Sequence, residues 1–147
     1  MKTWNHLSLC WVVPLAFVML FQGVNDATGA EKCLVCCMDV TKYPHTRVVV
    51  ESSDGKKFVT CGVQCGLMLH LILGDKWKSA VAVDLLSNLP FGAKEGFYVH
   101  KSSVITDMAP GFIAFKLKAN AEKFAAGFGG KVLTYEEAVA VWKEQMN

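Results

Sequence analysis

The chain has 147 residues, with 15 Lys and Arg against 13 Asp and Glu, for a formal net charge of +2. Its lysines are scattered and Arg47 is the only arginine, which excludes the basic stripe of a nucleic-acid-binding protein. The length fits one domain once a leader is removed.

The first thirty residues predict a secretory signal peptide. An uncharged apolar run at 7–21 follows a basic start and precedes a polar segment that ends in small residues at Ala30. We therefore expect residues 1–30 to be removed, and 31–147 to be exported to the periplasm or cell envelope with no membrane span. A retained anchor is the alternative, but the run is shorter than the roughly 20 apolar residues that a span needs.

The next segments predict a hairpin, a helix and a strand. β-Branched runs at 47–51 and 58–61 flank Ser53-Asp54-Gly55, a sequence typical of a hairpin turn. Residues 62–73 have the apolar spacing of a helix that ends at a glycine, and 80–85 predict a third strand.

The second half repeats this order. Residues 97–100 and 112–116 predict two strands, 121–128 a helix and 131–134 a closing strand. A last helix is predicted over 135–146.

Polar residues predict where these two helices begin. Asn120 fits an N-cap for the helix over 121–128. Thr134 and Glu137 fit a capping box at the start of the last helix.

These elements predict an α+β fold of two ββαβ units packed together, plus a C-terminal helix. The units cover 31–88 and 95–147, and a Pro- and Gly-containing connector over 86–96 joins them. Neither unit has enough apolar surface for a core of its own, so we expect a single domain over 31–147.

Five cysteines follow the leader, all in the first third of the remaining chain: Cys33, Cys36, Cys37, Cys61 and Cys65. Export favours disulfides. However, the number is odd and two of the cysteines are adjacent, so they cannot all pair within the chain. This clustering favours a metal site.

The segment Cys33–Met38 (CLVCCM) is the strongest local signal. Two thiolates separated by two residues can converge on one ion. A thioether beside thiolates favours Cu(I) over zinc, because both sulfur types are soft ligands. Core packing is the alternative role for Met38.

Cys61 and Cys65 form a second pair at the end of a strand and the start of a helix, where the helix dipole favours thiolate. A Cys-x-x-Cys knuckle, a hairpin and a Cys-x-x-x-Cys helix start together indicate a treble-clef-like metal site. The alternative is a disulfide of the Cys36–Cys65 type that ties the hairpin to its helix.

Other candidates are weaker. His45 could approach the metal or lie exposed in its loop, and His70 is predicted on the helix surface. Met108 lies in the loop of the second unit and could face the first cluster if the units are related by an approximate twofold axis. No nucleophile elbow or phosphate loop is present, so we predict no catalytic residues and no enzyme activity.

Several stretches resemble NosL-type copper-binding proteins, which are accessory factors of nitrous-oxide reductase. They are CLVCCMDV at 33–40, followed by Tyr43-Pro44, and the C-terminal stretches YVHKSS at 98–103, FIAF at 112–115 and AEKFAAGFGGKVLTYEEA at 121–138. The resemblance implies two ββαβ units and Cu(I) binding outside the cytoplasmic membrane.

Carried over to this sequence, the cysteine and methionine of the family's C-G-M motif fall on Cys36 and Met38, and a second-half methionine falls on Met108. The glycine of that motif is Cys37 here, and the leader lacks the lipobox typical of the family. The later cysteine pair also resembles the knuckle of TRASH-like metal-sensing modules.

These observations predict an exported Cu(I)-binding metallochaperone that exchanges copper with an envelope protein such as nitrous-oxide reductase. The predicted metal ligands are Cys33, Cys36, Cys37, Met38, Cys61, Cys65 and Met108. One alternative is a structural zinc knuckle in an interaction module. Another is a thiol–disulfide oxidoreductase using Cys33 and Cys36, although the thioredoxin-like context is missing.

Overall fold

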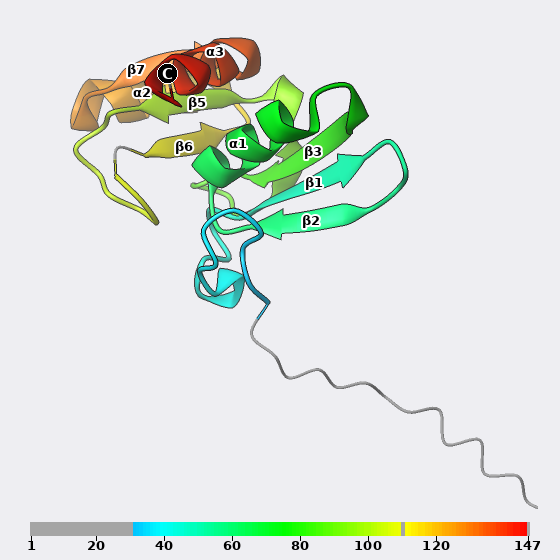
Figure 1. Cartoon of the computed structure of the whole chain (residues 1–147). Coiled ribbons are helices and arrows are strands. Elements are labelled where there is room, and N and C mark those ends of the chain that lie inside the picture. The colour runs from blue at the N-terminus through cyan, green and yellow to red at the C-terminus, as the bar shows by residue number, and fades with distance from the viewer. Residues whose placement is uncertain (1–30, 110, 147) are drawn as a thin grey trace, which may run out of the picture.

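The computed structural model describes residues 31–109 and 111–146, so the predicted signal peptide lies outside the described residues. Two antiparallel sheets, three α-helices and short 3-10 turns make up this part of the chain (Figure 1). In the described ranges, no helix is both long enough and apolar enough to cross a bilayer.

The first sheet contains the predicted hairpin and third strand. Its strand order is β2-β1-β3-β4, and every neighbouring pair is antiparallel. Helix α1 (Val63–Leu73) connects β2 to β3. The strands are β1 (Val48–Ser52), β2 (Lys57–Thr60), β3 (Trp77–Val83) and β4 (Pro90–Gly92).

The second sheet follows the same plan, with strand order β6-β5-β7 and antiparallel pairing throughout. Its strands are β5 (Phe97–His100), β6 (Phe112–Phe115) and β7 (Lys131–Thr134). Helix α2 (Lys118–Phe128) connects β6 to β7, and α3 (Tyr135–Met146) follows. The predicted α+β fold of two ββαβ units with a C-terminal helix is confirmed.

Three local details test the sequence reasoning. Strand β4 forms inside the segment predicted as a connector. Helix α2 begins at Lys118, so Asn120 lies in its first turn and the N-cap prediction is wrong. The capping box at the start of α3 is confirmed, because Glu137 Oε2 accepts from Thr134 N at 2.8 Å and Glu137 N donates back to Thr134 Oγ1 at 3.3 Å.

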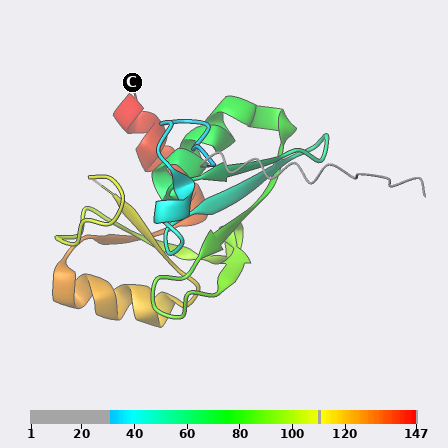
Figure 2. The same cartoon turned by 90° about the horizontal axis from the view of Figure 1, so that it is seen from below.

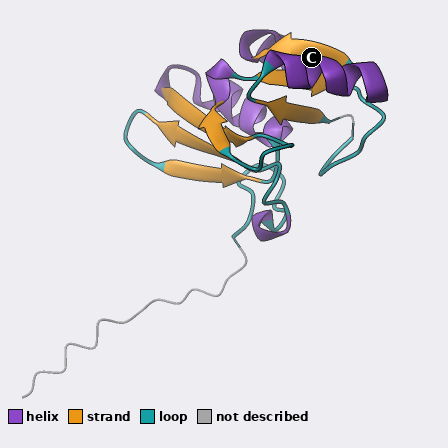
Figure 3. Ribbon diagram, turned by 180° about the vertical axis from the view of Figure 1, so that it is seen from behind, coloured by secondary structure: helices purple, strands orange, loops and turns teal. Residues whose placement is uncertain are grey.

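One apolar core spans both units. Helix α1 lies between the first sheet and the layer formed by α3 and the second sheet, as Figures 1 and 3 show. The largest core cluster combines Val50 and Leu67 of the first unit with Tyr98, Phe112 and Leu133 of the second. Helix α2 covers the other face of the second sheet, where Phe115 and Ala121 are buried. The two units therefore share their interior.

Asp84, in the loop after β3, joins the two units through hydrogen bonds. Its carboxylate accepts from Leu86 N at 3.0 Å, from Ser87 N at 2.8 Å and from Lys116 N, at the end of β6, at 2.7 Å. The side chain is buried, and burial alone would raise its pKa, but these donors together hold the pKa below its ordinary value.

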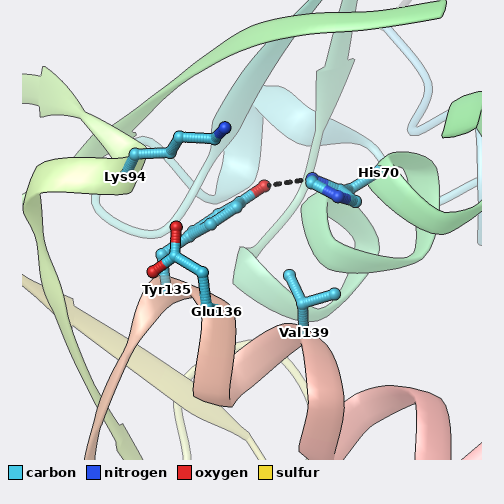
Figure 4. A pocket seen from close by; sticks show the side chains of 5 residues that line it. All are labelled: His70, Lys94, Tyr135, Glu136 and Val139. Carbon is cyan, nitrogen blue, oxygen red and sulfur yellow. Dashed lines mark hydrogen bonds between the residues drawn. The ribbon is translucent and has the colours of Figure 1, made fainter. Parts of the chain in front are cut away.

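A second polar contact joins the two units where α1 meets α3. His70 Nδ1 of α1 and the buried Tyr135 hydroxyl at the start of α3 are 2.9 Å apart and share a hydrogen bond (Figure 4). The two side chains line a hollow of about 270 Å³ together with Lys94, Glu136 and Val139. His70 is therefore half-buried at an inter-unit contact, not on an open helix surface as predicted.

Candidate metal centre

The segment before β1 folds into a tight knuckle. Cys33 N donates to Met38 O at 2.8 Å and Cys37 N donates to Cys33 O at 2.9 Å, while Lys32 and Asp39 pair as an isolated antiparallel bridge. This closed turn positions Cys33 and Cys36. Figure 2 looks at the molecule from this side and shows the segment, in blue and cyan, on the near side.

The second pair of thiols flanks the start of α1. Cys61 directly follows β2, Gly62 is the N-cap in extended conformation, and Cys65 lies in the first helical turn. Thr46, from the loop before β1, donates its hydroxyl to Cys61 O at 2.8 Å and so joins the two cysteine-bearing segments. Both Cys61 and Cys65 are buried.

Four sulfur atoms converge at this point, from Cys33, Cys36, Cys61 and Cys65, and they all lie within 4.8 Å of one another. The Sγ atoms of Cys36 and Cys61 are 3.4 Å apart, and those of Cys61 and Cys65 are 3.7 Å apart. A tetrahedral ion with metal–sulfur bonds of about 2.3 Å requires sulfur separations of roughly 3.8 Å. The four thiols therefore have the spacing of a soft-metal site, and none of the described cysteines forms a disulfide.

Two methionines pack against the buried cluster that Cys33, Cys61 and Cys65 form with Val40. Met38 comes from the knuckle, and Met108 comes from the loop between β5 and β6 of the second unit. The Tyr43 hydroxyl donates to Met38 Sδ at 3.8 Å and holds the thioether at the edge of the cluster. The structure thus brings the two predicted methionines to the four predicted cysteines. We refer to these six residues as the sulfur cluster.

The thiols differ in acidity. Burial raises the pKa of Cys33, but hydrogen bonds from the backbone N–H groups of Cys36, Cys61 and Val35 stabilise its thiolate and bring the pKa down to about 7. Burial raises the pKa of Cys61, and its hydrogen bond with Cys36 adds to the increase. Burial also raises the pKa of Cys65, as does the neighbouring Cys61. An ion that binds here must therefore displace protons from the buried thiols.

A carboxylate from the second unit lies beside the start of α1. A Cβ atom on Gly62 would lie 1.7 Å from Asp107 Oδ2, so any larger residue would force this carboxylate to move. That oxygen is buried and has no hydrogen-bond partner among the described residues, and burial raises the pKa of Asp107. Sequence reasoning missed Asp107, Tyr43 and Thr46 as neighbours of the site. The only signal was the position of Asp107 and Tyr43 next to predicted motifs.

Cys37 and the histidines of the described residues lie outside the cluster. The Cys37 side chain is exposed, and its backbone has a φ of 63°, a conformation that glycine adopts far more readily. His45 shares a hydrogen bond of 2.6 Å with Asn88 Oδ1 and is exposed. His100 stacks on Phe112 and bonds Gly111 O. Of the candidate ligands, the geometry therefore gathers the six sulfur-cluster residues.

Fold and site together define an α+β metal-binding protein with a thiol-rich centre. Cys33 and Cys36 lie in a turn, not at the start of a helix as in a thioredoxin-like oxidoreductase.

The chain belongs to the NosL family, whose sequence profile matches residues 24–141. Membership in this family agrees with the expectation of a metal-binding protein that is not an enzyme. Among solved structures, the crystal structure of the copper chaperone NosL from Shewanella denitrificans is similar in fold, with a TM-score of 0.66 and 22% sequence identity. The match covers 72% of this chain and 87% of that one. No curated protein matches the chain at a significant level.

Proposed function

We propose that this protein is an exported metallochaperone that carries Cu(I) in the sulfur cluster and passes it to a copper-receiving envelope protein. The observation that carries the proposal is the set of four thiols within 4.8 Å of one another, together with the packing of Met38 and Met108 against the buried cluster that contains three of them. Thiolate and thioether sulfur together select a soft monovalent ion.

The net charge of the metal with its ligands favours copper over zinc in this buried site. Zinc held by four thiolates carries two net negative charges, whereas Cu(I) held by one thiolate and thioethers is neutral. Burying net charge is costly, and burial raises the pKa of Cys61 and Cys65, which disfavours the fully ionised set. The cluster therefore favours the ion that needs fewer thiolates.

The copper-receiving protein is inferred from the family resemblance, which points to nitrous-oxide reductase, and from the description of the similar solved structure as a copper chaperone. A ligand set with more sulfurs than Cu(I) needs suits transfer, because a partner can replace one ligand while others hold the ion. Transfer is tested by mixing the copper-loaded chain with copper-free reductase and following the reductase copper-centre absorbance. No change in that absorbance would contradict this recipient.

Copper binding is tested by an anaerobic Cu(I) titration against a competing chromophoric chelator. We expect the Cys36→Ser, Met38→Leu double variant to bind Cu(I) at least about tenfold more weakly, equal to about 1.4 kcal/mol. The matched control changes the exposed Cys37 and Met146 to Ser and Leu and should retain the affinity. Equal affinities in the two double variants would contradict the proposed ligands.

A structural zinc site remains the second candidate, because the four cysteines alone supply a closed tetrahedral set. Native mass spectrometry of protein produced with both metals separates the two functions. Tight zinc binding, and loss of the fold when a chelator removes the zinc, would favour the structural role.

A further inference from the structure

Cys36 and Cys61 bring two separate segments of the chain into sulfur–sulfur contact. Their Sγ atoms are 3.4 Å apart, whereas a disulfide bond is about 2.05 Å long. Closing this gap requires the sulfurs to approach by only about 1.3 Å. Cys61 is fully buried at the end of β2, but Cys36 lies in the knuckle turn between the exposed Leu34 and Cys37. The required movement therefore falls on a surface turn.

We propose that the sulfur cluster is also a redox switch, in which a small-molecule disulfide converts the metal-free Cys36–Cys61 pair into a disulfide bond. This inference rests on the proposed metal-binding function, and it describes how that site is regulated. A bound Cu(I) and a Cys36–Cys61 disulfide exclude each other, because Cys36 is a proposed ligand and its sulfur is no longer a thiolate once it is in a disulfide.

The exchange occurs in two balanced steps. The Cys36 thiolate attacks one sulfur of the small disulfide and forms a mixed disulfide, and one small thiolate leaves. The Cys61 thiolate then attacks the Cys36 sulfur, and the second small thiolate leaves. Two protein thiols are oxidised, the small disulfide is reduced to two thiols, and the two protons from the cysteines go to these products.

Exposure and geometry favour this pair over Cys61–Cys65 and over Cys36–Cys37. Cys61 and Cys65 are 3.7 Å apart, but both are buried, so a solvent-borne disulfide does not reach them first. Adjacent Cα atoms are about 3.8 Å apart, below the usual 4.4–6.8 Å of disulfides, which disfavours a bond between Cys36 and Cys37. Cys36 is the only one of the four clustered thiols that is not fully buried.

The test uses the full-length chain with Cys10→Ser, fully reduced, metal-free and exposed to oxidised glutathione without oxygen. We expect a mass loss of two hydrogen atoms and a link, between tryptic peptides 33–42 and 58–76, that fragmentation assigns to Cys36 and Cys61. Alkylation should label the three remaining thiols. The Cys65→Ser variant retains both partners and should form the same bond, whereas Cys61→Ser should stop at the mixed glutathione adduct.

Loading with Cu(I) beforehand should slow oxidation at least about tenfold, because the thiolates are then ligands. Equal rates with and without Cu(I), a bond between other cysteines, or no bond at all would overturn the switch. The Cu(I) affinity of the same reduced protein is measured in parallel. Tight Cu(I) binding without the disulfide refutes only the switch, and the disulfide without Cu(I) binding refutes the proposed function.

Discussion

The two ββαβ units have the same topology but different chemistry. In each, the first strand lies in the middle, the second and third strands flank it, and a helix connects these two. All four clustered thiols belong to the first unit, whereas the second supplies Met108 and Asp107 from the loop between β5 and β6. The repeated plan thus supplies a scaffold, and the loops and helix start of one unit carry the metal chemistry.

The helices of the two units show why the site lies where it does. Most of the first two turns of α1 is buried, whereas Ala121 is the only buried residue of α2. Helix α1 lies between the first sheet and α3, and α2 covers the outer face of the second sheet. Cys65, in the first turn of the interior helix, is therefore buried together with most of its helical neighbours.

The largest expected effect concerns the contact that joins the units. Asp84→Ala leaves the N–H groups of Leu86, Ser87 and Lys116 without their acceptor. Because hydrogen bonds to a buried charged acceptor are strong, we expect the free energy of unfolding to fall by about 3 kcal/mol in urea denaturation. A loss below about 0.5 kcal/mol would show that the units dock without this carboxylate.

The same carboxylate predicts a pH dependence. Its folded-state pKa lies below the ordinary value, so its stabilisation is fully present above the unfolded-state pKa of about 4. That stabilisation should disappear as the pH falls through the folded-state pKa. Asp84→Asn, which cannot ionise, should have a flatter stability profile below pH of about 4 than the parent chain. Parallel profiles would contradict the assignment.

A glycine in each helix gives a matched pair of smaller, opposite effects. A Cβ atom on Gly66 in α1 would lie 2.9 Å from Val48 Cγ1, whereas one on Gly127 in α2 would meet nothing within 4 Å. We expect Gly66→Ala to destabilise by about 1–2 kcal/mol through overpacking. Gly127→Ala should stabilise by about 0.5–1 kcal/mol through helix propensity. Thermal or urea denaturation measures both, and effects of the same sign would contradict the proposed positions of the helices.

The smallest expected effect is at Cys37. Its φ of 63° is disfavoured for any residue with a Cβ, so Cys37→Gly should raise the free energy of unfolding by up to about 1 kcal/mol. Because the Cys37 side chain is exposed and its thiol is not among the four clustered ones, Cu(I) affinity should stay within about threefold of the parent value. Cys37→Ala is the matched control, since it removes the thiol and keeps the strained backbone. A tenfold loss of affinity in both variants would make Cys37 a ligand.

Most of the strands and helices could be predicted, because β-branched runs, an Asp-Gly turn and glycine stops are local signals. Strand β4 could not, since Pro90 and Gly92 indicate a loop and the strand exists only because β3 provides a partner at the sheet edge. The start of α2 carried no capping signal, because its N-cap Leu117 makes no side-chain hydrogen bond. Local patterns cannot report such tertiary effects.

The metal centre, like the fold, could be predicted only where its signals are local in the sequence. Spacing identified both thiol pairs, because each pair is local. Cys36 joins the cluster and the adjacent Cys37 does not. This choice depends on the positive φ at Cys37, which cannot be read from the sequence. The packing of Met108 against the thiol-containing cluster depends on how a loop some seventy residues further along the chain returns to the knuckle.

The knuckle has a practical consequence for anyone who handles this protein. Glu31 leads within two residues to Cys33, so anything fused before the described domain joins it beside the sulfur atoms. Helix α3 ends at the top of Figure 1, whereas the knuckle lies at the bottom of that view. A polyhistidine tag placed at the amino end would put competing imidazoles next to the cargo and distort a titration, so purification handles and fluorescent labels belong after α3.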